Sequence, residues 1–127
     1  MRDDLISTAT TVDKPWGNEV IFALVEGRFC GKVLNVREGE SLSLQYHRTK
    51  EEVIFLYQGA ITLQIGNSQD SLEHFSMKPG MAVHLRPGTL HRITGETDSV
   101  LLEVSSTELD DVVRLDDRYG REGTSAP

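Results

Sequence analysis

Four side chains that can bind a metal ion lie in the middle of the chain. Gln45 and His47 stand two residues apart, Glu52 follows His47 by five positions, and His91 comes just after a Pro-Gly turn at 87–88. Amide oxygen, imidazole and carboxylate groups are all competent ligands for a divalent transition metal. Because alternate residues of a strand share a face, Gln45 and His47 lie side by side, and Glu52 on the next strand is expected opposite His47.

The elements that would hold these residues are short strands. Turn signals containing glycine recur at short intervals, and the runs between them are β-branched or aromatic with period-two alternation. We expect strands near 19–26, 28–37, 41–47, 52–58, 60–65, 71–77, 81–86, 90–94 and 99–105. So many short strands, with no sustained 3.6-residue apolar repeat anywhere before residue 107, predict an all-β antiparallel sandwich or barrel.

Composition limits the possible partners. A chain of 127 residues allows one domain with one core. The balance of 20 Asp plus Glu against 13 Lys plus Arg argues against nucleic acid as a partner. Residues 28–92, however, carry eight basic and six acidic side chains, so an anionic small molecule is not excluded near the candidate site.

Cysteine usage and hydropathy point to the compartment. The single cysteine, Cys30, excludes an internal disulfide and a cysteine-based zinc site. The longest apolar run, 20–25, is far shorter than the roughly 20 residues that cross a bilayer. No signal peptide is visible at the polar N-terminus. We therefore expect a cytoplasmic protein with no membrane partner.

Three parts of the chain are expected. Residues 1–14 are polar and predicted to be a flexible N-terminal segment, 15–107 to be the barrel, and 108–127 to be a docked C-terminal segment and tail. The stretch 110–121 supports docking because apolar anchors interrupt its charged pattern. A dimer contact is the alternative for that stretch, and an exposed edge strand near the N-terminus would also suit a homodimer.

The metal-ligating residues lie in two motifs that resemble those of the cupin superfamily. The first cupin motif is a Gly, five residues, His-x-His, three or four residues, Glu, six residues and Gly, and the segment 39–59 matches it with Gln45 in place of the leading His. The second motif resembles the segment 80–91, although Gly95 stands where the family usually has Asn. The resemblance implies a single-domain cupin fold, a double-stranded β-helix or jelly-roll β-barrel.

A closer resemblance is to the mannose-6-phosphate isomerase-like cupin, which is found alone or fused to mannose-1-phosphate guanylyltransferases. It runs in collinear order from Lys-Pro-Trp-Gly at 14–17, through 42–47 and the His-Arg pair at 91–92, to 110–121. The sequence differs from this family at two places. It has Arg-Thr-Lys at 48–50, where the family often has further His and Arg, and Val-Ile at 53–54, where the family has His-Trp after the Glu. The resemblance implies a divalent transition metal, zinc first and manganese, nickel or iron as alternatives, held by Gln45, His47, Glu52 and His91.

Four more residues are candidates for the chemistry. Lys50 lies where isomerase relatives carry a basic active-site residue, and it could hold a phosphate or stabilise negative charge, or be a solvated turn lysine. Glu103 lies in Leu-Glu-Val at 102–104, which resembles an Ile-Glu-Val segment of the family, and it could be a buried acid that supplies a base or merely an outward charge. Arg92 follows His91 as in the family but points away from it by alternation, and Trp16 is a packing anchor or a cover for the barrel mouth. We take Lys50 and Glu103 as catalytic candidates, and Arg92 and Trp16 as substrate-binding candidates.

Three functions fit these residues. The first is an aldose–ketose isomerase of a sugar or sugar phosphate, in which the metal stabilises the enediolate formed as a proton moves between C1 and C2. The second is a non-haem iron oxygenase that uses His47, Glu52 and His91 as a facial triad, with Gln45 as a fourth ligand counting against it. The third is a non-catalytic metal- or sugar-binding module.

Overall fold

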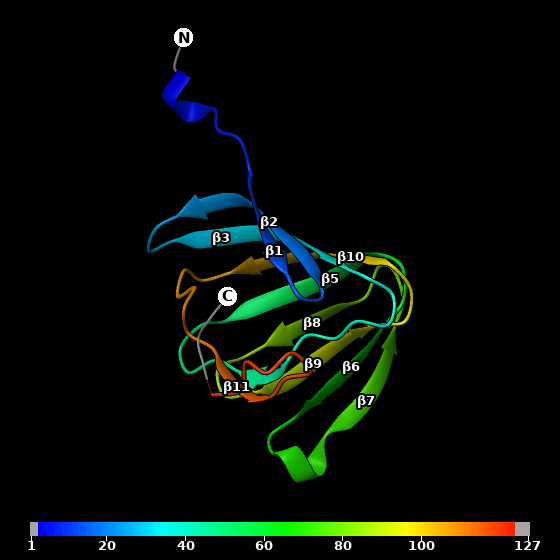
Figure 1. Ribbon diagram of the computed structural model, residues 1–127. Helices are drawn as coiled ribbons and strands as arrows, with labels where there is room; N and C mark the ends of the chain where they lie inside the picture. The colour runs from blue at the N-terminus through cyan, green and yellow to red at the C-terminus, as the bar shows by residue number, and fades with distance from the viewer. Residues whose placement is uncertain (1–2, 124–127) are drawn as a thin grey trace.

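Two antiparallel sheets enclose the interior of a barrel in the computed structural model, which describes residues 3–123 (Figure 1). The six-stranded sheet has the order β1 (Thr10–Lys14), β2 (Gly17–Val25), β3 (Phe29–Val36), β10 (Ser99–Ser105), β5 (Glu52–Gln58) and β8 (Ala82–Leu85). The five-stranded sheet has the order β11 (Val113–Asp116), β4 (Leu44–Tyr46), β9 (Leu90–Gly95), β6 (Ile61–Gly66) and β7 (Glu73–Met77). The predicted all-β cupin fold is confirmed.

Period-two alternation creates two layers inside the barrel. On β5 the inward side chains are Glu52, Ile54 and Leu56, so a carboxylate is followed by two core residues along one face. The same change from ionisable to apolar occurs on β9, from His91 to Ile93. An ionisable layer therefore lies against the hydrophobic core, whose buried members are Trp16, Leu34, Val36, Ile54, Leu56, Ile61, Leu63, Met77, Leu85, Ile93 and Leu101.

All nine predicted strands are present as β2 to β10, although the strand expected over 41–47 is reduced to Leu44–Tyr46. The structure adds β1 and β11, which the sequence pattern did not predict. Residues 1–14 were expected to be flexible, but from Thr10 onward the chain joins the sheet as β1. A polar sequence is compatible with this strand because β1 lies at the sheet edge and much of it is exposed to water. Residues 1–2 of that segment lie outside the described part.

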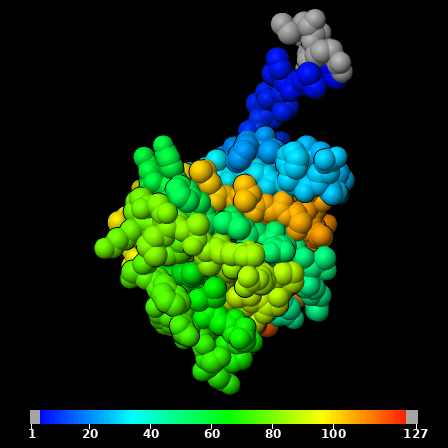
Figure 2. Space-filling view, turned by 180° about the vertical axis from the view of Figure 1, so that it is seen from behind, coloured from blue at the N-terminus to red at the C-terminus, as the bar shows by residue number. Residues whose placement is uncertain are grey.

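The turn between β1 and β2 requires its glycine. Gly17 has a φ of +153°, and a Cβ there would lie 1.8 Å from the carbonyl oxygen of Asn35. Only glycine lets β2 and β3 approach this closely. Before β1, the chain leaves the barrel as an arm with one 3₁₀ turn at Asp3–Leu5, which stands clear of the body from both sides (Figures 1 and 2).

The C-terminal segment is fixed across one end of the barrel. β11 pairs with β4, and the Asp111 carboxylate accepts the backbone N–H groups of Arg48, Thr49 and Lys50 at 3.0, 2.7 and 2.8 Å. Further along, the hydroxyl of Tyr119 accepts the backbone N–H of Ser41. Residues 124–127 of the predicted C-terminal segment and tail lie outside the described part of the chain.

Among residues 3–123, no helix has the length and apolar character that a membrane span needs.

Candidate metal centre and its cavity

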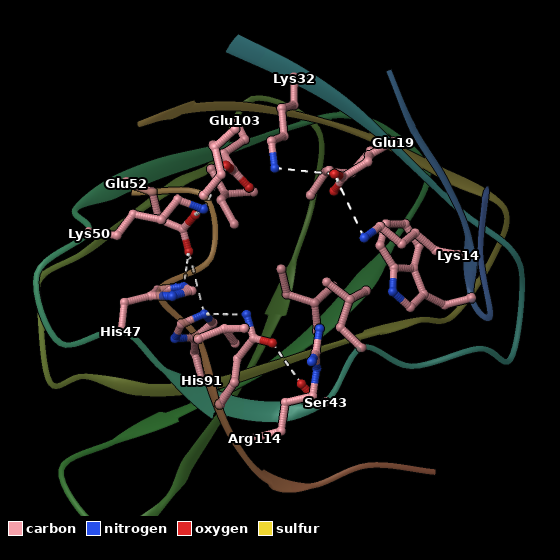
Figure 3. Close-up of a pocket in the computed structure, with 18 of the residues that line it drawn as sticks. Lys14, Glu19, Lys32, Ser43, His47, Lys50, Glu52, His91, Glu103 and Arg114 are labelled. Carbon is pink, nitrogen blue, oxygen red and sulfur yellow. Dashed lines mark hydrogen bonds and ion pairs between the residues drawn. The ribbon is translucent and has the colours of Figure 1, made fainter. Parts of the chain in front are cut away.

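The ionisable layer surrounds a cavity of about 280 Å³ at one end of the barrel (Figure 3). Side chains from both sheets and from the C-terminal segment form its wall, and they include most of the residues singled out from the sequence: Trp16, Gln45, His47, Lys50, Glu52, His91 and Glu103. Ligand pockets usually measure about 300–1,000 Å³, so the cavity suits a small molecule.

Three buried side chains in this wall form a metal-ligating cluster. One ligand atom from each of His47, Glu52 and His91 lies within 4.8 Å of the other two. Glu52 Oε1 is 3.1 Å from His47 Nε2 and 3.5 Å from His91 Nε2. The expected cross-strand pairing of Glu52 with His47 is wrong, because β4 and β5 belong to different sheets. The two side chains meet across the barrel interior instead.

Both histidine rings are held in one orientation by backbone carbonyls. His47 Nδ1 lies 2.5 Å from the carbonyl oxygen of Asp111, and His91 Nδ1 lies 3.0 Å from that of Thr89. A carbonyl oxygen only accepts, so each neutral ring carries its proton on Nδ1 and turns the Nε2 lone pair toward Glu52. Lone pairs and a carboxylate need a cation between them, either a proton or a metal ion. The donor set therefore fits a divalent transition metal.

Gln45 completes this side of the cavity from β4, directly opposite His91 on β9. Its amide nitrogen is 3.5 Å from His91 Nε2, and its Oε1 accepts a hydrogen bond from Ser43 Oγ at 2.6 Å. Ligation through Oε1 thus requires the amide to turn over. Ser43 Oγ can then accept from the amide nitrogen, because a hydroxyl both donates and accepts.

Lys50 links the metal-ligating cluster to Glu103. Its Nζ lies 3.2 Å from both Glu52 Oε2 and Glu103 Oε2, and with an exposed fraction of 6% it is not a solvated turn lysine. Burial by itself lowers the pKa of Lys50, but the charges of Glu103 and Glu52 outweigh burial and raise that pKa above its usual range. Lys50 is therefore a buried cation held between two carboxyl groups.

The two carboxyl groups differ in their protonation. When a proton rather than a metal ion lies between each Nε2 and the carboxylate, hydrogen bonds from His47 and His91 and the charge of Lys50 outweigh the effect of burial and hold the pKa of Glu52 well below the usual range. Burial, followed by the charge of Glu52, raises the pKa of Glu103. The structure thus places an ionised carboxylate at the cluster and a more basic one beside it.

Comparison with known proteins identifies the family. The family model described as "Mannose-6-phosphate isomerase C-terminal" matches residues 2–117. The chain belongs to this cupin family. Over 115 residues it is 30% identical to the xanthan biosynthesis protein XanB of Xanthomonas campestris pv. campestris (strain B100), a match that covers 87% of this chain and 23% of XanB. The chain therefore spans less than a quarter of that relative.

Solved structures agree with the cupin fold. CapF, a capsular polysaccharide assembling protein from Staphylococcus aureus, superposes with a TM-score of 0.78 at 17% identity, covering 92% of this chain and 34% of CapF. KdgF from Halomonas sp. superposes with a TM-score of 0.65 at 19% identity, covering 76% of this chain and 84% of KdgF. At such low identity these similarities establish the fold alone.

Two residues predicted to bind substrate occupy different places in this cupin domain. Trp16 is buried in the cavity wall. Arg92 lies outside the cavity, because neighbouring residues of a strand point to opposite faces and His91 points inward. Its Nε donates to Gln64 Oε1 at 2.7 Å, and its Nη1 lies 2.8 Å from Asp116 Oδ2. The structure thus separates Arg92 from the other candidates.

The sequence patterns did not single out a second charged group in the wall. Lys14 on β1, Glu19 on β2 and Lys32 on β3 face the cavity opposite His47 (Figure 3), and Arg114 and Arg121 reach it from the C-terminal segment. A signal existed on β3, where a lysine shares the inward phase of period two with buried apolar residues.

Proposed function

We propose that this cupin domain is a metal-dependent aldose–ketose isomerase acting on a sugar or sugar phosphate. The observation that carries the proposal is a metal-ligating cluster and a Lys50–Glu103 ion pair sharing the wall of one small cavity. Such an isomerisation needs an electrophile at the sugar oxygens and a group that moves one proton, so both requirements have candidates here. Membership of the mannose-6-phosphate isomerase C-terminal family supports the same reaction class.

His47, Glu52 and His91 would hold the metal, with Gln45 as a fourth ligand once its amide turns over. Two imidazoles, a carboxylate and an amide oxygen suit zinc first, and manganese, nickel or iron as alternatives. A divalent ion bound there supplies Lewis-acid polarisation of a sugar carbonyl.

Glu103 and Lys50 would carry the remaining chemistry. Glu103 removes a proton from the carbon that bears the hydroxyl group and returns it to the neighbouring carbonyl carbon. The hydroxyl proton moves to the former carbonyl oxygen in the same exchange, so the sugar keeps its composition. Lys50 holds the Glu103 carboxylate in place at 3.2 Å and puts a positive charge beside the oxygen that becomes negative.

The test is to incubate the metal-loaded protein with hexoses and hexose phosphates in D₂O and to follow the sugars by NMR. We expect aldose and ketose to interconvert with deuterium entering at C1 or C2. Glu103→Gln should lower the rate by about 100-fold or more while metal binding persists. Glu73→Gln, which removes the charge of an exposed acid on β7, is the matched control and should leave the rate unchanged.

Other outcomes would contradict the proposal. Oxygen uptake by the iron-loaded protein, without sugar isomerisation, would favour the oxygenase hypothesis. Binding of sugars with no turnover under any metal would favour the non-catalytic module.

A further inference from the structure

The C-terminal segment runs antiparallel along the part of the chain that supplies most of the metal ligands. We call residues 41–52 the ligand segment, because three of the four candidate ligands belong to it. Near its start, the hydroxyl of Tyr119 accepts the backbone N–H of Ser41. In its middle β4 pairs with β11, and near its end the Asp111 carboxylate binds the backbone of 48–50. The two segments therefore lie together over almost the whole ligand segment.

The strand in the middle of the ligand segment depends on this neighbour. β4 is only three residues long and lies between β11 and β9. Among the described residues it has three registered pairs with β11, but only the pair of Gln45 with His91 joins it to β9. β11 therefore supplies most of the strand pairs that fix β4, and it belongs to the C-terminal segment.

Asp111 is the residue of this segment that reaches a metal ligand. Its backbone carbonyl oxygen lies 2.5 Å from His47 Nδ1. Its side chain accepts the N–H of Arg48 through Oδ1, and those of Thr49 and Lys50 through Oδ2. A carboxylate suits these three donors because both of its oxygens only accept. One residue thus holds the ring of a ligand and the backbone turn that follows it.

The two histidine ligands differ in where this support comes from. His91 Nδ1 contacts the carbonyl oxygen of Thr89, which is two positions earlier in the same turn. The carbonyl that His47 contacts is 64 positions later in the chain. The support of His91 is therefore local, whereas His47 Nδ1 meets its acceptor only when the C-terminal segment is docked.

We propose that Asp111 is a positioning residue that couples docking of the C-terminal segment to metal binding, an inference that rests on the metal site of the proposed function. Its carbonyl keeps the proton of His47 on Nδ1 and so leaves Nε2 as the ligand atom. Its carboxylate does not touch the ring but anchors that carbonyl by binding 48–50. The same bonds fix the backbone of Lys50, whose ammonium group contacts Glu52.

Coupling of this kind acts in both directions. If docking raises the affinity for the metal, a bound metal stabilises docking by the same factor. The backbone N–H groups of 48–50 report docking directly, because each donates to Asp111. Their hydrogen exchange should slow when zinc binds to the unmodified protein. The N–H of Met81, which donates to Lys78 in a turn outside the cavity lining, is the control and should not change.

The experiment combines zinc titration with NMR of the ring protons at saturating zinc. Asp111→Ala should weaken zinc binding by at least about ten-fold, the loss expected when a contact that orients a ligand is removed. The Nδ1 proton of His47 should exchange faster with water, whereas that of His91 should not. Asp111→Asn keeps one acceptor oxygen and should lie between the unmodified protein and Asp111→Ala in both measurements.

Asp117→Asn is the matched control. It removes charged hydrogen bonds to Arg121 inside the C-terminal segment, but Asp117 makes no hydrogen bond to the ligand segment among those described. Zinc affinity and both ring protons should stay as in the unmodified protein. Thermal unfolding checks that each variant folds. If Asp111→Ala does not fold, Asp111→Asn and the hydrogen exchange at 48–50 decide the outcome.

The outcomes separate this inference from the isomerase function. Unchanged zinc affinity in the Asp111 variants, equal changes at the rings of His47 and His91, or exchange at 48–50 that ignores zinc would overturn the positioning role and leave the isomerase function standing. Losses confined to the Asp111 variants, together with no turnover of any sugar by the unmodified protein, would support the positioning role and overturn the isomerase function.

Discussion

The two walls of the cavity balance their buried charges in different ways. The first wall carries the metal-ligating cluster, and the second carries Lys14, Lys32 and Glu19. On the metal side, Lys50 lies between two carboxyl groups, and backbone carbonyls fix both histidine rings, so the groups are held before any ligand arrives. On the second wall, Lys14 and Lys32 share a single carboxylate oxygen, Glu19 Oε1. The difference is that the cation of the first wall has a carboxyl group on each side, whereas the two lysines of the second wall depend on the same carboxylate.

The walls also differ in the elements that carry them. Glu52 and Glu103 lie on β5 and β10, and His91 lies on β9, all of which have a neighbouring strand on each side. Lys14 lies on the edge strand β1, and Arg114 lies on the edge strand β11. The residues Glu52, Glu103 and His91 are thus held by a neighbouring strand on each side, whereas Lys14 and Arg114 lie on strands with one open edge.

The largest expected effect tests the metal side. His91→Gln removes an imidazole whose Nε2 faces Glu52, and we expect zinc affinity to fall by at least about 100-fold, since loss of even a supporting contact costs 10- to 100-fold. Competition with a chelator measures the affinity. His84→Gln, at an exposed histidine outside the cavity, should bind zinc as the unmodified protein does. Equal losses in both variants would mean that the cluster is not the zinc site.

The free energy of unfolding of the metal-free protein should also distinguish the two walls. Lys50→Met leaves Glu52 and Glu103 facing each other without their shared cation, and we expect a loss of about 3–5 kcal/mol in the free energy of unfolding. Lys32→Met should cost no more than about 1 kcal/mol, because Glu19 keeps Lys14 and the repulsion among the remaining cations falls. Urea unfolding at pH 7 measures both. Similar losses for the two variants would erase the distinction between the walls.

The same contrast explains what the sequence could and could not predict. Gln45, His47 and Glu52 lie in one local motif, so their spacing was enough to predict that they meet. The spacing did not predict the right strand pairing for Glu52. Nothing in the local sequence shows that β4 and β5 belong to different sheets. Glu103, far from the motif, was found through the family resemblance.

The second charged group in the cavity wall was missed because its members come from separate strands. Lys14, Lys32 and Arg114 lie on β1, β3 and β11, and two of those strands are short polar edges without a strong strand pattern. Only long-range pairing brings the three together. Lys32 alone carried a local signal, as a lysine in phase with the buried Cys30 and Leu34.

Acid should loosen the end of the chain that supplies the arginines. Burial tends to raise the pKa of Asp117, but hydrogen bonds from Arg121 outweigh it and lower that pKa. The pair therefore stabilises the fold above the unfolded-state pKa of about 3.9, and this stability is lost as pH falls through the lower folded-state pKa. At pH 6, Asp117→Asn should cost about 2 kcal/mol in urea unfolding.

That cost should shrink as pH drops below about 4, because the unmodified carboxylate then also becomes neutral. Asp116→Asn, next to it but largely exposed, is the control and should show little change over the same range. A cost for Asp117→Asn that stays constant from pH 6 to pH 3 would contradict an ionic role for Asp117.

The smallest effect is expected outside both walls, at Arg92. Its ion pair with Asp116 is exposed, and such pairs contribute about 0–1 kcal/mol, so Arg92→Met should barely change urea unfolding. Because its guanidinium binds Gln64 and Asp116 on the outer face of β9, titration with a hexose 6-phosphate should give the same affinity to within about two-fold. A ten-fold loss instead would restore Arg92 as a substrate-binding residue and move the ligand away from the cavity, because this side chain cannot reach it while His91 points inward.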